Sequence, residues 1–312
     1  MDYVPLGRSG LKVSRVCLGT NMIGDYVDLP GSERMVNAFL DTGGNFIDTS
    51  NSYSKTRSEE LLGQILRGRG RHEVVLATKV ATQVGPSPHD GGGSRKHILD
   101  SVEQSLKRLQ TDYIDLYQMH RWDDATPIEE TMRTLDDLVR QGKVRYIGCS
   151  NYAAWQVCKA MWVSERLGVE RFVSAQPSYS FLERAIEREV VPVCRDQDIG
   201  IIPYQVLLSG MVTGRYKPGE APPAGSRMAE RERSRTRSFN ERNFRAVQQV
   251  LDLSKAYAID PVQLTIAWAL HKPGITSVIA GASKPEHVRS NLEATAIRLS
   301  AEQVKALDAV GS

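Results

Sequence analysis

Short apolar runs alternate with helical periodicity along the chain between residues 16 and 280. The runs have the length of buried β-strands, and the segments between them carry apolar side chains on one helical face. Eight such strands separated by helices are typical of a (β/α)8 TIM barrel, but a doubly wound parallel sheet gives the same alternation. The predicted strands are residues 16–18, 45–47, 74–77, 114–119, 146–149, 172–175, 200–203 and 277–280.

Turn and capping residues mark the ends of several elements. Residues 3–6 and 11–13 flank a turn that runs from Gly7 to Gly10, which predicts a β-hairpin that plugs one end of a barrel. Thr126 begins a capping box with proline at the first helical position, and Gly142 stops the same helix.

Two long loops interrupt the alternation, at residues 82–93 and 216–240. Loops of this length in a compact domain are usually functional or mobile. The second loop becomes arginine-rich, and we interpret its arginines as a solvated surface that nearby glutamates partly neutralise. These arginines are Arg231, Arg233, Arg235 and Arg237.

Four polar residues fall at or just past the ends of predicted strands. Asp48 ends the second strand, with Tyr53 five positions later, Lys79 ends the third and His120 ends the fourth. Parallel barrels assemble catalytic groups at the C-terminal ends of their strands, so we expect these side chains to share one mouth. An acid, a phenol, an ammonium and an imidazole collected there make a plausible proton-transfer site.

In that site Tyr53 is the natural proton donor to a carbonyl oxygen. Because an opposite charge favours the ionised form, a neighbouring Lys79 ammonium is predicted to lower the pKa of this phenol from about 10 toward neutrality. Asp48 would keep Lys79 charged, and His120 would orient the carbonyl. Taken singly, each residue fits a structural role equally well.

Composition narrows the class of protein. The 312 residues are 41% hydrophobic and 25% charged, and the net charge of +3 is too small to argue for a nucleic-acid or membrane partner. No apolar stretch is long enough to span a bilayer, no secretory signal is seen at the start, and no His-x-x-x-His pair suggests a metal site. We therefore expect a cytoplasmic protein. Its cysteines are scattered and are predicted to be small buried residues, namely Cys17, Cys149, Cys158 and Cys194.

Longer motifs accompany these four residues along nearly the whole chain. They are Leu18-Gly19-Thr20, Asn45-Phe46-Ile47-Asp48-Thr49, Tyr53, Ser58-Glu59-Glu60-Leu61-Leu62-Gly63, Ala77-Thr78-Lys79, Asp112-Tyr113-Ile114-Asp115-Leu116-Tyr117, His120 and Gly142-Lys143-Val144-Arg145-Tyr146-Ile147-Gly148-Cys149-Ser150-Asn151. With these motifs the chain resembles the aldo-keto reductase superfamily over nearly its whole length. The resemblance implies a single TIM-barrel domain over residues 1–312 that binds NADPH and reduces aldehydes or ketones, with Tyr53 as general acid and Asp48, Lys79 and His120 as its supporting set.

The cofactor is implied by this resemblance alone, because no Gly-x-Gly-x-x-Gly follows a strand. By resemblance, Ser150, Asn151 and Gln176 hold the nicotinamide amide, and Tyr204 stacks on its ring. The further residues that the resemblance assigns to the cofactor are Gly19, Thr20, Asn21, Asp48, Gln205, Val206, Leu207, Ser209, Gly210, Arg215, Arg227, Gly281, Ser283, Lys284, His287 and Asn291.

Three positions depart from the pattern of the family, which usually has Pro at Val206, Gln or Arg at His287, and Glu at Ser290. We predict that the protein prefers NADPH to NADH. Because His287 is mostly neutral at pH 7, this preference for the 2′-phosphate is expected to be weaker than in a protein with Arg at this position. Ser283 also begins a capping box for the next helix, an interpretation that stands beside its cofactor role.

The resemblance implies a small carbonyl compound as substrate, and Asn21, Tyr26, Asn51 and Trp122 are expected to face it together with Tyr53 and His120. Their polar groups favour a hydroxylated compound such as a keto-sugar. A homo-oligomer is left open. Two functions remain as alternatives to a carbonyl reductase. One is a nucleotide-sensing regulatory subunit such as the potassium-channel β subunits, which have Asn where this chain has His120. The other is a Schiff-base lyase that uses a neutral Lys79.

Overall fold

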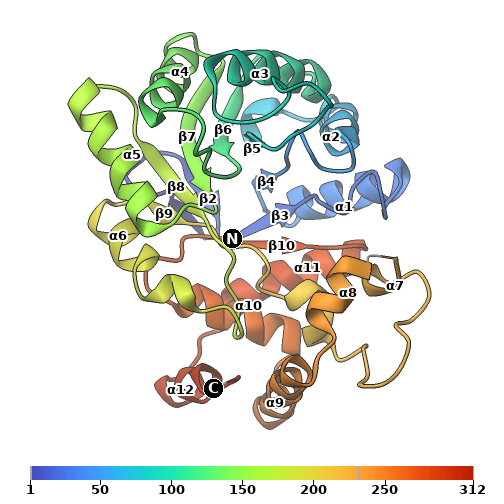
Figure 1. Ribbon diagram of the computed structural model, residues 1–312. Helices are drawn as coiled ribbons and strands as arrows, with labels where there is room; N and C mark the ends of the chain where they lie inside the picture. Colours follow the sequence, from blue (N-terminus) through green and yellow to red (C-terminus); the bar gives the residue numbers. More distant parts are fainter. Residues whose placement is uncertain (1, 231, 312) are drawn as a thin grey trace.

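The strands of the chain form two sheets in a computed structural model that describes residues 2–230 and 232–311. Eight of the described strands run parallel in the order β10-β3-β4-β5-β6-β7-β8-β9, and helices surround them (Figure 1). Their bounds are β3 Val16–Gly19, β4 Phe46–Asp48, β5 Val75–Val80, β6 Ile114–Met119, β7 Val144–Ser150, β8 Phe172–Gln176, β9 Gly200–Ile201 and β10 Val278–Gly281.

The sheet closes on itself, which decides between the two predicted architectures. Ile201 N–H donates to Gly274 O at 3.2 Å, Thr276 N–H to Ile201 O at 2.8 Å, and Ile279 N–H to Pro203 O at 2.9 Å. These bonds join the β9 side of the sheet to the β10 side, as a barrel requires. The prediction of a (β/α)8 barrel is confirmed, and the doubly wound alternative is wrong.

Helices follow the strands because each buries an apolar stripe against the outside of the barrel. In Figure 1 the helices from α1 to α6 and α10 and α11 ring the strands, with α9 and α12 further out. The bounds are α1 Leu29–Asp41, α2 Arg57–Leu66, α3 Arg95–Leu109, α4 Ile128–Arg140, α5 Ala154–Leu167, α6 Val190–Asp196, α7 Arg227–Glu230, α8 Glu232–Ser238, α9 Glu241–Tyr257, α10 Pro261–His271, α11 Pro285–Glu293 and α12 Ala301–Asp308.

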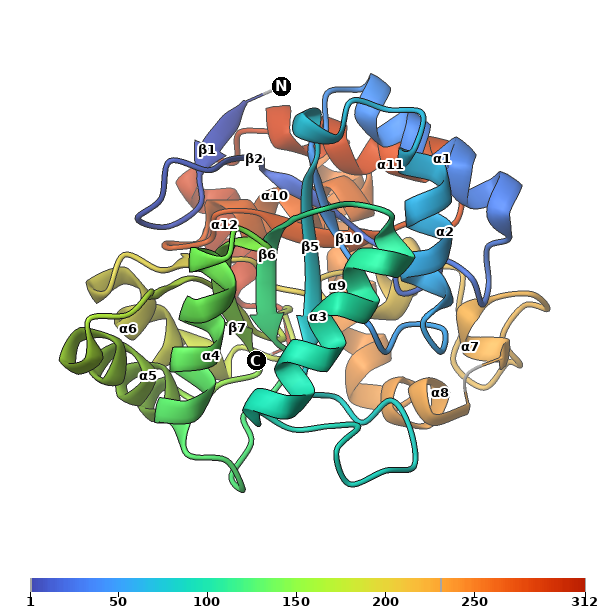
Figure 2. The same cartoon turned by 90° about the horizontal axis from the view of Figure 1, so that it is seen from above.

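The predicted hairpin is present and closes one end of the barrel. Strands β1 (Tyr3–Pro5) and β2 (Lys12–Ser14) pair antiparallel, and Figure 2 shows them at the end of the molecule opposite to α7 and α8. Leu6 and Val13 are fully buried and pack against inward-facing residues of the barrel strands such as Phe46 and Leu116. The plug therefore leaves the C-terminal ends of the strands as the open mouth.

Several local predictions need correction. Helix α4 begins at Ile128 with Pro127 as its N-cap residue and no side-chain cap, because the Thr126 hydroxyl donates to Asp123 instead. Cys158 is exposed, whereas Cys17, Cys149 and Cys194 are buried as predicted, and all four thiols are free.

The region predicted as one long loop at 216–240 contains the short helices α7 and α8. Of its arginines, Arg235 forms a 4.0 Å ion pair with Glu232, in agreement with a partly neutralised surface. The placement of Arg231 and the side chains of Arg233 and Arg237 lie outside the described residues.

Candidate active site

A buried lysine stands at the centre of the polar residues at the barrel mouth. Asp48 is the last residue of β4, Lys79 lies near the end of β5, and Tyr53 lies in the loop between β4 and α2. Lys79 Nζ donates to Asp48 Oδ2 at 2.6 Å, to Thr49 O at 2.8 Å and to the Tyr53 hydroxyl at 3.0 Å. The Lys79 side chain is 0% exposed and that of Asp48 is 2% exposed, so the pair is desolvated and held by hydrogen bonds on several sides.

The second oxygen of Asp48 is held by two glutamines. Gln176 Nε2 donates to Asp48 Oδ1 at 2.8 Å and Gln118 Nε2 does so at 3.2 Å. Gln176 ends β8, as expected for a residue at the mouth, whereas the role of Gln118 was missed. Its only sequence signal is a polar residue inside an apolar strand, two positions before His120.

The electrostatics of the lysine agree with the prediction, but those of the phenol do not. Burial lowers the pKa of Lys79, but the Asp48 carboxylate and the Tyr53 oxygen outweigh it, so the pKa lies above its ordinary value. Burial raises the pKa of Tyr53, and the opposing effect of Lys79 does not overcome it. The predicted net lowering of the pKa of Tyr53 is therefore wrong, because removing a phenolate from water costs more than one ammonium returns.

His120 follows β6 and is held as an uncharged ring. Burial together with the positive charges of Lys79 and Arg121 lowers the pKa of His120 to about 3. Its ring lies edge-on to the ring of Tyr53, with 5.9 Å between centroids. Nδ1 lies 3.2 Å from the Ser50 hydroxyl and 3.1 Å from the Thr82 hydroxyl.

Strained backbone accompanies these strand ends. Ala81 directly follows β5 with a φ of 89°, and Asn151 directly follows β7 with a φ of 58°. Residues other than glycine rarely adopt a positive φ, and those that do cluster at binding and catalytic sites. The loops at the mouth therefore hold conformations that local sequence preference alone would not select.

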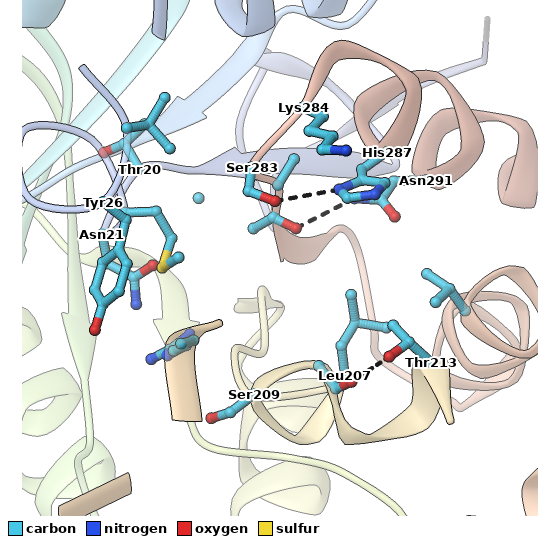
Figure 3. A pocket seen from close by; sticks show the side chains of 18 of the residues that line it. Thr20, Asn21, Tyr26, Leu207, Ser209, Thr213, Ser283, Lys284, His287 and Asn291 are labelled. Atoms are coloured by element: carbon cyan, nitrogen blue, oxygen red, sulfur yellow. Dashed lines mark hydrogen bonds between the residues drawn. The ribbon is translucent and has the colours of Figure 1, made fainter. Parts of the chain in front are cut away.

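A cavity of about 860 Å³ extends from Asp48 and Tyr53 to helix α11. Most residues that the resemblance assigned to a cofactor line it: Gly19, Thr20, Asn21, Asp48, Gln176, Tyr204, Gln205, Val206, Leu207, Ser209, Gly210, Arg215, Arg227, Gly281, Ser283, Lys284, His287 and Asn291. Figure 3 shows Thr20, Asn21 and Tyr26 on one side of this space and Ser283, Lys284, His287 and Asn291 on another.

Ser150 and Asn151 do not line this cavity but contact residues that do. The Ser150 hydroxyl donates to Gln176 O at 2.8 Å, and Asn151 Oδ1 accepts from the Tyr204 hydroxyl at 2.8 Å. Both partners line the cavity, so these two residues contact its wall without forming part of it.

Asn51 and Trp122, which were expected to face a substrate, do not line this cavity. Asn51 is 2% exposed and is not part of the cavity wall, because its loop turns it inward, where its N–H points at Lys79 O at 3.4 Å. Trp122 packs edge-on against Tyr152 and Trp155 and also lies outside the wall. Asn21, Tyr26 and Tyr53 do line the cavity, whereas His120 does not.

Cationic side chains line the cavity. Arg215, Arg227 and Lys284 line it, and helix α11 directs its N-terminus there, which adds partial positive charge. The predicted capping box of this helix is absent, because Lys284 is the N-cap residue and the Ser283 hydroxyl contacts His287 Nδ1 at 3.4 Å. Burial and the charge of Arg215 lower the pKa of His287, so its ring is neutral at pH 7.

Sequence reasoning missed a further part of the wall, which comes from α1, the start of α10, β10 and loops far apart in the chain. No motif pointed to these residues, because only the closure of the barrel brings them together. They are Met22, Val27, Asp28, Gly31, Arg34, Thr213, Tyr216, Gly225, Ser226, Asp260, Pro261, Val262, Ile279 and Ala282. Ser290, where the family pattern has Glu, also lines the cavity.

Comparisons with known proteins agree with this geometry. The sequence model of the Aldo/keto reductase family matches residues 15–312. A probable voltage-gated potassium channel subunit beta of Arabidopsis thaliana is 35% identical over 300 residues, which cover 94% of this chain and 91% of that protein. An uncharacterized oxidoreductase of Bacillus subtilis is 36% identical over 99% of this chain and 95% of its own length. The aryl-alcohol dehydrogenase (NADP+) of Phanerodontia chrysosporium is 35% identical over 96% and 83%.

Proposed function

This chain belongs to the aldo/keto reductase family, and from that premise we propose that it reduces the carbonyl group of a small aldehyde or ketone to an alcohol with NADPH. The observation that carries the proposal is the Tyr53 hydroxyl 3.0 Å from a lysine that Asp48 keeps charged, beside a large cavity. No described helix is long and apolar enough to cross a membrane, and we propose that the enzyme works in the cytoplasm.

The residues of the cavity fit a phosphorylated dinucleotide. A volume of about 860 Å³ is near the upper end of the range for ligand pockets. Arg215, Arg227 and Lys284 provide positive charge for phosphates, and the N-terminus of α11 adds backbone N–H groups. Tyr204 offers a ring for stacking, fixed by its hydrogen bond to Asn151. The cationic groups support NADPH over NADH as the cofactor, because NADPH carries one more phosphate.

The reaction divides between the cofactor and the residues of the chain. When bound, NADPH supplies the hydride for the carbonyl carbon. Tyr53 delivers a proton to the developing alkoxide oxygen, and its raised pKa means that the phenol carries this proton at neutral pH. The Lys79 ammonium then stabilises the phenolate that remains, and Asp48 keeps that lysine charged. His120, being neutral, orients the carbonyl by hydrogen bonding rather than by donating charge.

The substrate class is narrowed only in part. Asn21 and Tyr26 line the cavity and offer polar contacts to a substrate. They support a hydroxylated carbonyl compound, whereas the aryl-alcohol dehydrogenase among the relatives supports an aromatic aldehyde. A panel of purified compounds from both classes would decide, and reaction with apolar aromatic aldehydes alone would exclude the keto-sugar class.

The test of the mechanism is Tyr53→Phe. This variant should lose at least about a hundredfold in reductive turnover, because the proton donor is gone while the shape of the site is kept. NADPH affinity, measured by fluorescence titration against NADH, should remain near that of the wild type and above that of NADH. Tyr3→Phe, in the exposed hairpin, is the matched control. Turnover retained in Tyr53→Phe would show that the proton comes from another group.

A regulatory subunit that senses the cofactor is the second candidate, supported by the potassium channel relatives. It would bind NADPH with little turnover. Measured reduction of generic aldehydes would exclude it, and binding without reduction across the panel would favour it.

The Schiff-base lyase has no support, because Lys79 is charged and bonded to a carboxylate at 2.6 Å, whereas imine formation needs a neutral amine.

A further inference from the structure

His120 is held through both its backbone and its ring by different segments of the mouth. Its backbone N–H donates to Val80 O at 2.8 Å, and its carbonyl accepts from Asn151 Nδ2 at 3.0 Å. Its Nδ1 atom meets the hydroxyls of Ser50, from the loop after β4, and Thr82, from the loop after β5. The position of the ring is thus fixed independently of any ligand.

The chemistry of Nδ1 decides what the other ring nitrogen can do. A neutral imidazole carries one proton, so one nitrogen donates a hydrogen bond and the other accepts. If Nδ1 accepts, Nε2 carries the proton and can donate to a carbonyl oxygen. If Nδ1 is protonated, Nε2 is only an acceptor and repels that oxygen. Among residues 2–230 and 232–311, no hydrogen-bond partner is found for Nε2, which leaves it free for a substrate.

The two hydroxyls favour the first arrangement. The backbone N–H of Ser52 donates to the Ser50 oxygen at 3.2 Å, and the Ser52 hydroxyl lies 2.9 Å from the same oxygen. When the Ser52 hydroxyl also donates to this oxygen, both lone pairs of Ser50 are occupied and its own proton goes to His120 Nδ1. In the described part of the chain, the partner of the Thr82 hydroxyl is His120 Nδ1, at 3.1 Å. Two proton donors therefore converge on one nitrogen. Ser50 is fully buried, so water does not compete for its proton, and among its described contacts the other possible acceptor is the Ser52 hydroxyl.

We propose that Ser50 and Thr82 are positioning residues that hold His120 in its Nε2–H tautomer, so that Nε2 donates a hydrogen bond to the carbonyl oxygen of the substrate. The second half of this statement rests on the proposed function. The tautomer itself is a property of the protein alone and can be measured without turnover.

The test is nitrogen-15 NMR of the imidazoles, with the His120 signals assigned by loss in His120→Gln. The wild type should give a bare Nδ1 and a protonated Nε2 at neutral pH. The double variant Ser50→Ala with Thr82→Val should give a mixture of tautomers, and its kcat should fall about tenfold, the worth of one good hydrogen bond. NADPH affinity should be unchanged, because neither side chain lines the cavity.

Two kinds of control separate this role from general stability. Ser50→Thr with Thr82→Ser keeps both hydroxyls and should keep the single tautomer. Ser54→Ala and Ser87→Ala remove hydroxyls from the same two loops, where they contact Ile23 O and the N–H of His89 instead of His120, and should change nothing. A protonated Nδ1 in the wild type, or an unchanged tautomer in the double variant, would overturn the proposal. The expected tautomers in a protein that reduces no carbonyl would support the positioning role and count against the proposed function alone.

Discussion

Replacing Lys79 by methionine tests the buried ion pair as an energetic unit. Methionine fills a similar volume without charge, so the change removes the three hydrogen bonds of Nζ to Asp48, Thr49 and Tyr53. The Asp48 carboxylate, 2% exposed, would keep only its two glutamine donors at Oδ1 and would have no partner at Oδ2. Breaking a buried pair by removing one partner costs about 3–5 kcal/mol. For a chain of 312 residues this corresponds to a fall in Tm of about 5–8 °C.

The assay is denaturant unfolding of the cofactor-free protein at pH 7, with Lys79→Met, Asp48→Asn and the double variant as a cycle. In the double variant the amide oxygen that replaces the carboxylate can still accept from Gln118 and Gln176, and no buried charge is left. This variant should therefore be more stable than Lys79→Met by about 2 kcal/mol. A Lys79→Met variant within about 1 kcal/mol of the wild type, or additive effects in the cycle, would refute this reasoning.

Two further outcomes follow from the structure. Reductive kcat/KM should not change between about pH 6 and about pH 9. The pKa of His120 is about 3, and the pKa of Tyr53 is raised above its ordinary value of about 10, so neither group changes its protonation state in this range. A break near pH 6–7 in the pH profile would show that another group titrates. Gly7→Ala should lower the free energy of unfolding by at least ~2 kcal/mol, because Gly7 has a φ of 54° and an added Cβ would lie 2.4 Å from Val173 O. Gly10→Ala, which meets open space in the same turn, is its control, and equal unfolding midpoints for the two variants would contradict the claim.

The strands and the placement of Asp48, Lys79 and His120 could be predicted because both depend on local patterns. An apolar run fixes a strand, and the parallel alternation fixes which end of it faces the mouth. The cavity residues that come from other parts of the chain could not be predicted from such local patterns. Arg34 and Asp260 reach the cavity only because the barrel closes, and no local pattern records that.

Competition between partners explains the errors in local chemistry. The sequence predicts Thr126 and Ser283 as capping residues, but their hydroxyls bind side chains instead. The Thr126 hydroxyl donates to Asp123, and the Ser283 hydroxyl contacts His287. The predicted lowering of the pKa of Tyr53 was wrong for a related reason. The sign of the lysine contribution follows from residue types, whereas the opposing cost of burial depends on how much protein surrounds the phenol.

The site has two parts, a cationic wall and a buried ion pair, and only the ion pair helps to decide between a reductase and a sensing subunit. The cationic wall formed by Arg215, Arg227 and Lys284 would hold a dinucleotide for either function. The buried pair of Lys79 and Asp48 is different, since a desolvated ion pair is a poor way to gain stability compared with apolar residues of similar size. Its contact with the Tyr53 hydroxyl is of use where a phenol must lose and regain a proton. Cofactor sensing alone needs no such contact, so the presence of this costly arrangement favours turnover.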